Sequence, residues 1–190
     1  PAASAVTSLC SPIAMPTVAA IIAESPAAAR DAAEAIMVDY EELPAVTNLH
    51  DAIAPGAPQL WPAAGNNIVA ETRYGDQAAV DTAFAKAAHV VALDLVNQRL
   101  APVSMEPRVV LADYDSAGDR FTIRMSTQMP SGFRDQLCKE VLDIPTDRVR
   151  VLVGDVGGGF GMKTGLYAED AVVAFAARRL GRPVKWAAER

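Results

Sequence analysis

The sequence of 190 residues carries 17 lysine and arginine residues against 23 aspartate and glutamate residues, so its formal net charge is −6. A nucleic-acid interface needs clustered basic residues that neutralise phosphates, and the longest basic run here is the pair Arg178-Arg179. These features argue against nucleic-acid binding. Hydrophobic residues make up 51% of the chain, which is enough for a globular protein with a core of useful size.

The two cysteines, Cys10 and Cys138, and the two histidines, His50 and His89, are widely separated along the chain. Zinc and iron–sulfur sites need such ligands at short, characteristic spacings. None of those spacings occurs here, so we predict that side chains of this chain hold no metal ion. The low cysteine content is also typical of a reducing cytoplasm, which is the compartment we expect.

The first 23 residues carry no charge, which raises the question of a membrane segment. Pro1, Pro12 and Pro16 interrupt the stretch, whereas a spanning helix needs roughly 20 mostly apolar residues. A secretory signal would contain a basic region. We therefore predict neither a membrane span nor a secretory signal. Because the chain starts with proline and not methionine, we expect a fragment or a processed end.

The beginning of the chain predicts a strand–helix–strand unit. An apolar run at 17–23 predicts a buried strand, and the alternating pattern at 37–43 predicts a second one. Between them, Ser25 offers an N-cap and Pro26 fits the first helical position, so a helix is expected over 27–36.

A linker rich in proline and glycine follows between residues 54 and 67, and we place a domain boundary near Pro62. Beyond it, strands are predicted at 67–74, 90–98, 108–114, 121–128, 148–153 and 184–187, and helices at 77–88, 131–142 and 166–180. In the helix at 131–142, Phe133, Leu137 and Val141 are expected to share a buried face. The last strand is expected to be an unprotected sheet edge. This order of elements favours two α+β domains with mixed sheets.

The glycine-rich segment 154–164, GDVGGGFGMKT, is the most unusual stretch. Glycine tolerates positive φ and lets backbone N–H groups approach a ligand closely, and the helix N-terminus that follows favours an anion such as a phosphate. Two nucleotide-binding motifs do not fit. The P-loop needs glycine directly before Lys-Ser/Thr, where this chain has Met162, and G-x-G-x-x-G would need glycine at Met162 or Thr164. From spacing alone, a loop that packs the helix on the strand and binds nothing fits equally well.

Five segments in a fixed order carry the strongest signal in the chain. They are DYEELPA at 39–45, Asn-Asn-Ile at 66–68, a Met-Glu-Pro element within 97–108, Ser-Thr-Gln at 126–128 and GGGFGMK at 157–163. Together they resemble the large subunits of molybdenum hydroxylases, the family of xanthine dehydrogenase, aldehyde oxidase and carbon monoxide dehydrogenase. The resemblance extends over residues 17–187.

The resemblance implies an α+β fold and a fragment of the molybdenum-binding subunit. Residues 1–62 would be the C-terminal part of an α/β hammerhead-like domain, and residues 63–190 the first part of a mixed-sheet molybdopterin-binding domain. The family's catalytic glutamate would lie beyond position 190. Glu106 is expected to be a structural carboxylate and not its substitute.

The same resemblance assigns roles around the glycine loop. In this family a pterin dithiolene holds the molybdenum, which agrees with the lack of metal-ligand spacings. Gln128 is implied as the catalytic residue of this chain, because it would donate its side-chain amide to an oxo ligand on the metal. Gly158, Gly159, Phe160 and Gly161 would line the cofactor together with Gln128.

The family reaction hydroxylates an aldehyde or N-heterocycle, or oxidises carbon monoxide, with water as the oxygen source. The resemblance therefore implies molybdopterin in its cytosine dinucleotide form, a small-molecule substrate, and [2Fe-2S] clusters and FAD on partner subunits. The remainder of the molybdenum subunit would complete the site, so we expect this fragment to be inactive alone and to oligomerise. Thr164 replaces a glutamate of the purine-oxidising members, which argues against a purine substrate. Two alternatives stay open: a stand-alone cofactor- or nucleotide-binding module, and an inactive truncated remnant.

Overall fold

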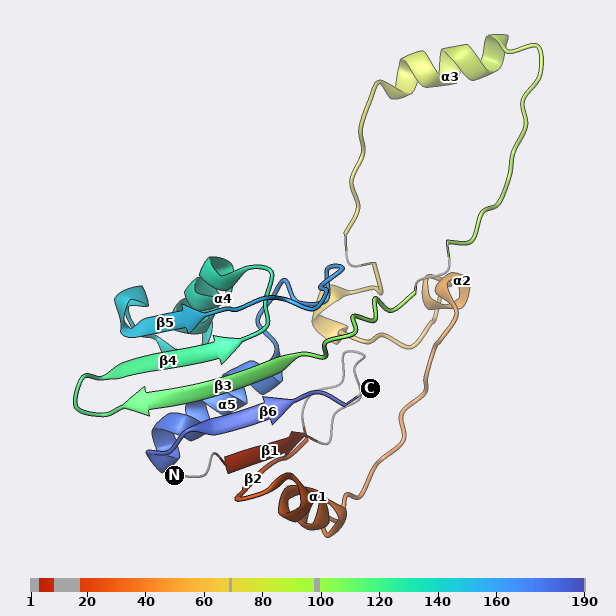
Figure 1. The fold of residues 1–190 in the computed structure, drawn as a ribbon. Coiled ribbons are helices and arrows are strands. Elements are labelled where there is room, and N and C mark those ends of the chain that lie inside the picture. Colours follow the sequence, from red (N-terminus) through yellow and green to blue (C-terminus); the bar gives the residue numbers. More distant parts are fainter. Residues whose placement is uncertain (1–3, 9–17, 69, 98–99, 190) are drawn as a thin grey trace. The chain divides into compact units, whose positions relative to one another are not determined.

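The computed structural model describes residues 4–8, 18–68, 70–97 and 100–189 (Figure 1). The chain divides into two compact units. The larger unit comprises Pro1–Met37 and Arg99–Arg190, and the smaller unit comprises Val38–Gln98.

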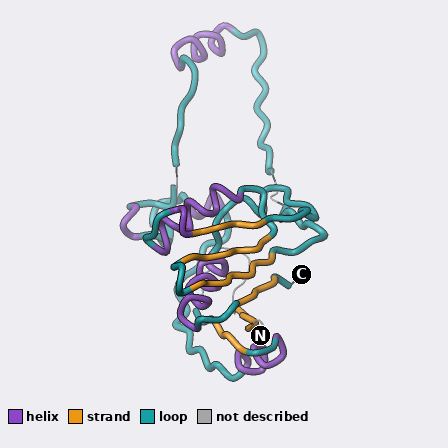
Figure 2. Tube along the Cα trace, turned by 60° about the vertical axis from the view of Figure 1, so that its left-hand side comes forward, coloured by secondary structure: helices purple, strands orange, loops and turns teal. Residues whose placement is uncertain are grey.

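A mixed sheet of six strands forms the larger unit (Figure 2). In chain order, its strands are β1 (Ser4–Ser8), β2 (Ala20–Ala23), β3 (Val109–Asp115), β4 (Arg120–Met125), β5 (Val149–Leu152) and β6 (Val184–Ala187). Their spatial order is β2-β1-β6-β3-β4-β5. The pairs β1–β6 and β4–β5 are parallel, and the other neighbours are antiparallel. This arrangement confirms the α+β class with a mixed sheet.

Strand β6 is not the unprotected edge that its place in the sequence predicts. It lies between β1 and β3, with Val184 beside Ser4 and Trp186 beside Val110. The prediction is wrong because the first residues of the chain, which show no strand pattern, form β1 and cover that edge. Both long sides of β6 are therefore paired with neighbouring strands.

The core lies on one face of this sheet. Side chains alternate between the faces of a strand, and the inward positions of β3, β4 and β6 are buried against α5 (Ala168–Leu180). Members of this core include Val110, Ala112, Phe121, Ile123, Val173, Ala177, Val184 and Trp186. Gly181 ends α5 in a left-handed conformation, with a φ of +61°, which glycine adopts without steric penalty. No helix in the described part of the chain has the length and hydropathy to cross a membrane.

The helix that follows β4 changes its type half-way. It begins as α4 (Pro130–Gln136) and continues as a π-helix (Leu137–Leu142). A π-turn bonds residue i to i+5, so the positions that follow rotate away from the face that α-helical spacing predicts. Phe133 is buried as expected, whereas Val141 is 42% exposed and Leu142 is buried in its place.

Among the described residues, the smaller unit contains three helices, and local side chains cap the first and the third of them. They are α2 (Leu49–Ala52), a 3-10 helix (Pro62–Ala64) and α3 (Gln77–Lys86). Asp76 caps α3 by accepting the N–H of Ala79, at 3.1 Å, as its position before the helix predicts. The α1 helix of the larger unit (Pro26–Glu34) begins in the same way at Ser25.

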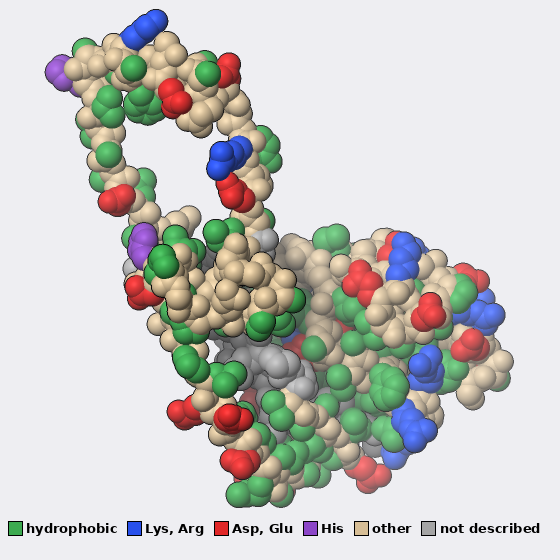
Figure 3. All heavy atoms as spheres, turned by 180° about the vertical axis from the view of Figure 1, so that it is seen from behind, with side chains coloured by type: hydrophobic (Ala, Val, Ile, Leu, Met, Phe, Trp, Pro, Cys, Tyr) green, Lys and Arg blue, Asp and Glu red, His purple; other side chains and the backbone are tan. Residues whose placement is uncertain are grey.

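The strands predicted at 37–43, 67–74 and 90–98 are wrong for the residues that the structure describes, since these form irregular chain. Residues 69 and 98 lie outside the described residues. A strand needs a hydrogen-bonded neighbour, and none pairs with these segments among the described residues. Their apolar side chains consequently face solvent: Tyr74 is 94% exposed and Val91 is 91% exposed. Figure 3 shows such hydrophobic side chains along the chain beside α3.

Candidate functional site

Three segments of the larger unit meet at one edge of its sheet. The parallel strands β4 and β5 end at the same edge, so residues 126–128 and the glycine-rich loop after β5 come together there. Strand β3 runs antiparallel to β4, so the residues before β3, at 104–108, also lie at this edge. Three of the five motifs recognised in the sequence, the Met-Glu-Pro element, Ser-Thr-Gln and the glycine loop, are therefore neighbours in space.

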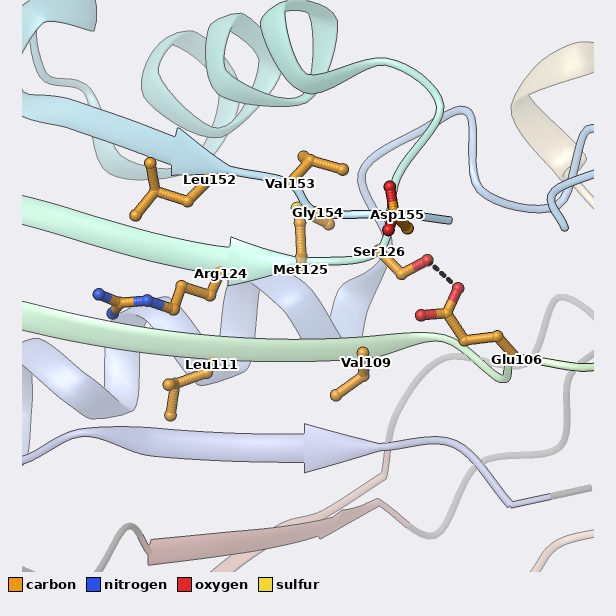
Figure 4. Close-up of a pocket in the computed structure, with 10 residues that line it drawn as sticks. All are labelled: Glu106, Val109, Leu111, Arg124, Met125, Ser126, Leu152, Val153, Gly154 and Asp155. Atoms are coloured by element: carbon orange, nitrogen blue, oxygen red, sulfur yellow. Dashed lines mark hydrogen bonds between the residues drawn. The ribbon is translucent and has the colours of Figure 1, made fainter. Parts of the chain in front are cut away.

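One carboxylate oxygen joins these three segments. Oε2 of Glu106 accepts hydrogen bonds from Ser126 Oγ at 2.6 Å, from the Gly157 N–H at 2.7 Å and from Lys163 Nζ at 2.8 Å. Lys163 Nζ also donates to Ser126 Oγ, at 2.9 Å. We call Glu106, Ser126, Gly157 and Lys163 the clasp. Figure 4 shows its Glu106–Ser126 hydrogen bond.

The clasp contains a fully buried ammonium group. The side chain of Lys163 is 0% exposed and that of Glu106 is 33% exposed. A buried charge is costly unless it is paired and hydrogen-bonded, which Glu106 and Ser126 achieve. The donors Lys163, Ser126 and Gly157, in this order of effect, lower the pKa of Glu106 to about 2. A carboxylate with so low a pKa is a weak proton acceptor at neutral pH, which fits the structural role expected for Glu106.

The clasp also explains one glycine of the loop. Glu106 N–H donates to the Gly157 carbonyl at 3.2 Å, in addition to the carboxylate bond in the opposite direction. A Cβ atom at position 157 would lie 2.5 Å from Cβ of Glu106. Only glycine permits this close approach.

Gln128 lies directly on the glycine loop. Its Oε1 accepts hydrogen bonds from the backbone N–H groups of Gly161 at 3.2 Å and Lys163 at 3.4 Å. The backbone N–H of Gln128 donates to the Lys163 carbonyl at 2.9 Å. Because two donors bind Oε1, the network fixes which end of the amide faces the loop. Nε2 donates no hydrogen bond within the described ranges, so it is the free donor of the side chain.

The loop backbone adopts conformations that favour glycine. Its φ angles are +96° at Gly158, +51° at Phe160 and +88° at Gly161. Positive φ in a phenylalanine is strained, and such strain concentrates at functional sites. Phe160 is also 73% exposed, so hydrophobic burial does not account for its position.

Four N–H groups of the segment 157–163, those of Gly157, Gly161, Met162 and Lys163, are used within the protein. The N–H groups of Gly158, Gly159 and Phe160 have no acceptor in the part of the chain that the structure describes. Three consecutive backbone donors therefore remain for a ligand with oxygen acceptors.

A second set of contacts anchors the end of the loop to α5. Tyr167 Oη donates to the Met162 carbonyl at 2.8 Å, and the guanidinium of Arg108 lies 3.7 Å from the centre of the Tyr167 ring. Arg108 also pairs with Glu169 at 3.1 Å. Asp170 accepts the Tyr167 N–H at 3.1 Å, and burial raises the pKa of Asp170 to about 6.

A groove of about 440 Å³ opens beside the clasp (Figure 4). Its floor is the sheet face opposite the core, because Leu111 and Arg124 alternate with the buried positions of β3 and β4. Glu106 and Asp155 belong to its lining. No group of three or more histidine, cysteine, aspartate or glutamate side chains among the described residues could hold a metal ion.

The family model of the molybdopterin cofactor-binding domain matches residues 60–190. The chain belongs to this family. The resemblance to molybdenum hydroxylase large subunits is thereby confirmed.

The chain is similar to subunits of two dehydrogenases and to an oxidoreductase of known structure. The chain is 37% identical to the gamma subunit of the 6-hydroxypseudooxynicotine dehydrogenase complex of Paenarthrobacter nicotinovorans, covering 91% of this chain and 21% of that subunit. It is 34% identical to the carbon monoxide dehydrogenase large chain of Hydrogenophaga pseudoflava, covering 93% and 23%. The crystal structure of quinoline 2-oxidoreductase from Pseudomonas putida 86 matches with a TM-score of 0.82 at 37% identity, covering 91% and 22%. The chain thus spans about a fifth of the length of these relatives.

The structure brings together the residues that the sequence points to, and adds others. Gln128 contacts Gly159 and Gly161, and Phe160 lies between these two glycines in the chain. Sequence reasoning gave no role to Lys163 or Ser126, although both stand inside recognised motifs. No sequence pattern marks their contacts with Glu106, because these contacts join separate motifs and exist only after folding.

Proposed function

We propose that this chain forms one wall of a molybdopterin site in a molybdenum-dependent oxidoreductase. The observation that carries the proposal is the fixed carboxamide of Gln128. Its Oε1 is held by the glycine loop, so its free donor and three loop N–H groups are available to oxygen acceptors. Molybdopterin is rich in such acceptors. Glycine at position 159 leaves room for the Gln128 carboxamide, which a side chain there would overlap. The residues present fit the cofactor.

Each residue of the site has a role in binding. Nε2 of Gln128 would donate to an oxygen on the metal, which is the catalytic part we assign to this chain. Gly158, Gly159, Phe160 and Gly161 would line the cofactor, and their lack of side chains, Phe160 excepted, allows it to approach the backbone. We propose the cytosine dinucleotide form, because its diphosphate suits backbone N–H donors. When bound, the molybdenum centre supplies the two-electron oxidation chemistry.

We propose hydroxylation of an aldehyde or N-heterocycle, or oxidation of carbon monoxide, with water as the oxygen source. Support comes from the names of the relatives, which refer to 6-hydroxypseudooxynicotine, quinoline and carbon monoxide. The match covers about a fifth of each relative. We therefore propose that the remainder of the subunit supplies the catalytic glutamate, and that the chain is inactive alone.

We propose that the partners of this chain are iron–sulfur and flavin subunits. We also propose that the complex is oligomeric and lies in the cytoplasm. The relative from Paenarthrobacter nicotinovorans is itself named as a subunit of a complex. We also propose a domain boundary between residues 62 and 63, since the match to the family model begins at residue 60.

The test is the cofactor content of the purified full-length protein. We expect molybdenum, measured by mass spectrometry, and pterin, measured by fluorescence after oxidation, in a ratio of one to one. The variant Gln128→Leu keeps a side chain of similar size and removes both the Nε2 donor and the Oε1 acceptor that holds the loop, so its molybdenum content should fall. Gln77→Leu, on α3 of the smaller unit, is the matched control. Wild-type protein that contains neither molybdenum nor pterin but binds a nucleotide would contradict the proposal.

A further inference from the structure

The two ends of the glycine loop are held by one atom. Gly157 and Lys163 bound the segment GGGFGMK, and both donate to Oε2 of Glu106, at 2.7 and 2.8 Å. Ser126 Oγ is the third donor to that oxygen, at 2.6 Å. The carboxylate therefore closes the loop from its first residue to its last. It also fixes the closed loop to the end of β4.

Lys163 connects this closure to Gln128. Its backbone N–H donates to Oε1 of Gln128 at 3.4 Å, and its carbonyl accepts the Gln128 N–H at 2.9 Å. The same carbonyl accepts the hydroxyl of Thr127, at 2.9 Å. A displacement of Lys163 would therefore displace the groups that determine which end of the Gln128 amide faces outward.

The burial of this lysine calls for an explanation beyond stability. Replacing a buried ion pair by apolar side chains of similar volume is often neutral or stabilising. Lys163 is fully buried, and its ammonium group bonds to Glu106 and Ser126. A role in fixing one loop conformation accounts for a charge at this position, where a methionine would fill similar space.

We propose that Lys163 and Glu106 are positioning residues. They clamp the two ends of the glycine loop and so orient the Gln128 carboxamide with its Nε2 toward bound molybdopterin. The inference rests on the proposed function, because molybdopterin is the ligand toward which Gln128 is oriented. It adds the device that sets this orientation.

The first experiment measures amide hydrogen exchange in the full-length protein. Lys163→Met should accelerate exchange of the hydrogen-bonded amides of Gly157, Gly161 and Met162 by about tenfold or more, which corresponds to losing one hydrogen bond to a charged group. Peptides from β3 and β4 should keep their protection. Lys139→Met, at an exposed lysine, is the matched control and should leave the loop unchanged. If exchange in the glycine loop of Lys163→Met equals that of wild type, the proposal that the clasp holds the loop is wrong.

The second experiment is a double-mutant cycle on molybdopterin content, with Lys163→Met, Gln128→Leu and both together. If Lys163 acts through Gln128, the double variant should lose no more cofactor than Gln128→Leu alone, because coupled residues are not additive. A purely structural role for Lys163 would make the two losses add, and additive losses would overturn the inference.

The two proposals fail in different ways. If wild-type protein contains no molybdopterin, the proposed function is wrong, and so is the part of this inference that concerns the cofactor. Amide hydrogen exchange in the glycine loop would still show whether Lys163 and Glu106 hold the loop. If Lys163→Met does not fold, the variant Glu106→Gln/Lys163→Met gives the same comparison, since it leaves no buried charge unpaired.

Discussion

The carboxamide of Gln128 lies against the backbone of Gly159, in the space that any side chain at position 159 would occupy. Glycine is required there for room, because a Cβ atom would meet the Cδ and Oε1 atoms of Gln128. Gly159→Ala should therefore push the carboxamide off the loop. It should also break the bonds that Oε1 accepts from Gly161 and Lys163.

We expect Gly159→Ala to cost about 1–3 kcal/mol in the free energy of unfolding, as for other changes that disrupt a packed polar contact. Urea unfolding measures this cost, and amide exchange at Gly161 reports the lost hydrogen bond. Gly165→Ala is the control in the same loop, because a Cβ at position 165 has no heavy atom within 4 Å. Equal effects of the two substitutions would contradict the steric explanation.

The two partners of the buried ion pair should differ in their effect on stability. Glu106→Gln leaves the ammonium of a fully buried Lys163 without its anion, and should cost about 3–5 kcal/mol. Lys163→Met should cost less, since the Glu106 carboxylate keeps Ser126 and Gly157 as donors. The measurement is urea unfolding of both single variants and the double variant, which should recover part of the Glu106→Gln loss. A larger cost for Lys163→Met would show that the electrostatic account is wrong.

Asp170 should make the protein less stable as the pH rises. Burial raises the pKa of Asp170 from 3.8 to about 6, so the folded state binds its proton more tightly than the unfolded state does. This contribution is fully present below pH 3.8 and is lost as the pH rises through about 6.

Asp170→Asn tests this dependence, because asparagine cannot ionise but can still accept the Tyr167 N–H. We expect a flatter stability profile between pH 4 and 6 for the variant, and stability at pH 7 at least equal to wild type. Asp113→Asn, at an exposed position of β3, should leave the slope unchanged. A wild-type slope that persists in Asp170→Asn would assign the pH dependence to another group.

Two neighbouring side chains of the π-helix after α4 should differ in their contribution to the free energy of unfolding. Val141 is 42% exposed and Leu142 is 7% exposed. Leu142→Ala should cost about 2–5 kcal/mol, as is typical of a large-to-small change in a core. Val141→Ala should change the free energy of unfolding by about 0.5 kcal/mol or less. The reverse order would mean that the helix keeps α-helical spacing to its end.

Features that depend on neighbouring residues were predictable from the sequence. Ser25 caps its helix as expected, and Asp76, directly before its helix, does the same, because a cap is formed within three residues of the chain. The exposure of Val141 was not predictable, since the change to π-helical spacing has no marker in the pattern of apolar residues.

Long-range pairing was harder to predict. The position of β6 in the middle of the sheet depends on β1, about 180 residues away in the chain, and no local pattern encodes that distance. In the site, the motifs pointed to Gln128 and the glycine loop, which lie in contact in the structure. They did not reveal that Glu106 and Lys163 join, because a contact between separate motifs exists only after folding.

The complete burial of Lys163 makes this residue a chemical reporter of the folded state. The other three lysines, Lys86, Lys139 and Lys185, are exposed and should react readily with amine-directed reagents such as acetic anhydride. The reagent can reach Lys163 only when its side chain leaves Glu106 and becomes exposed to solvent. Acylation at this one position, followed by peptide mass spectrometry, would therefore count the molecules in which the glycine loop has opened.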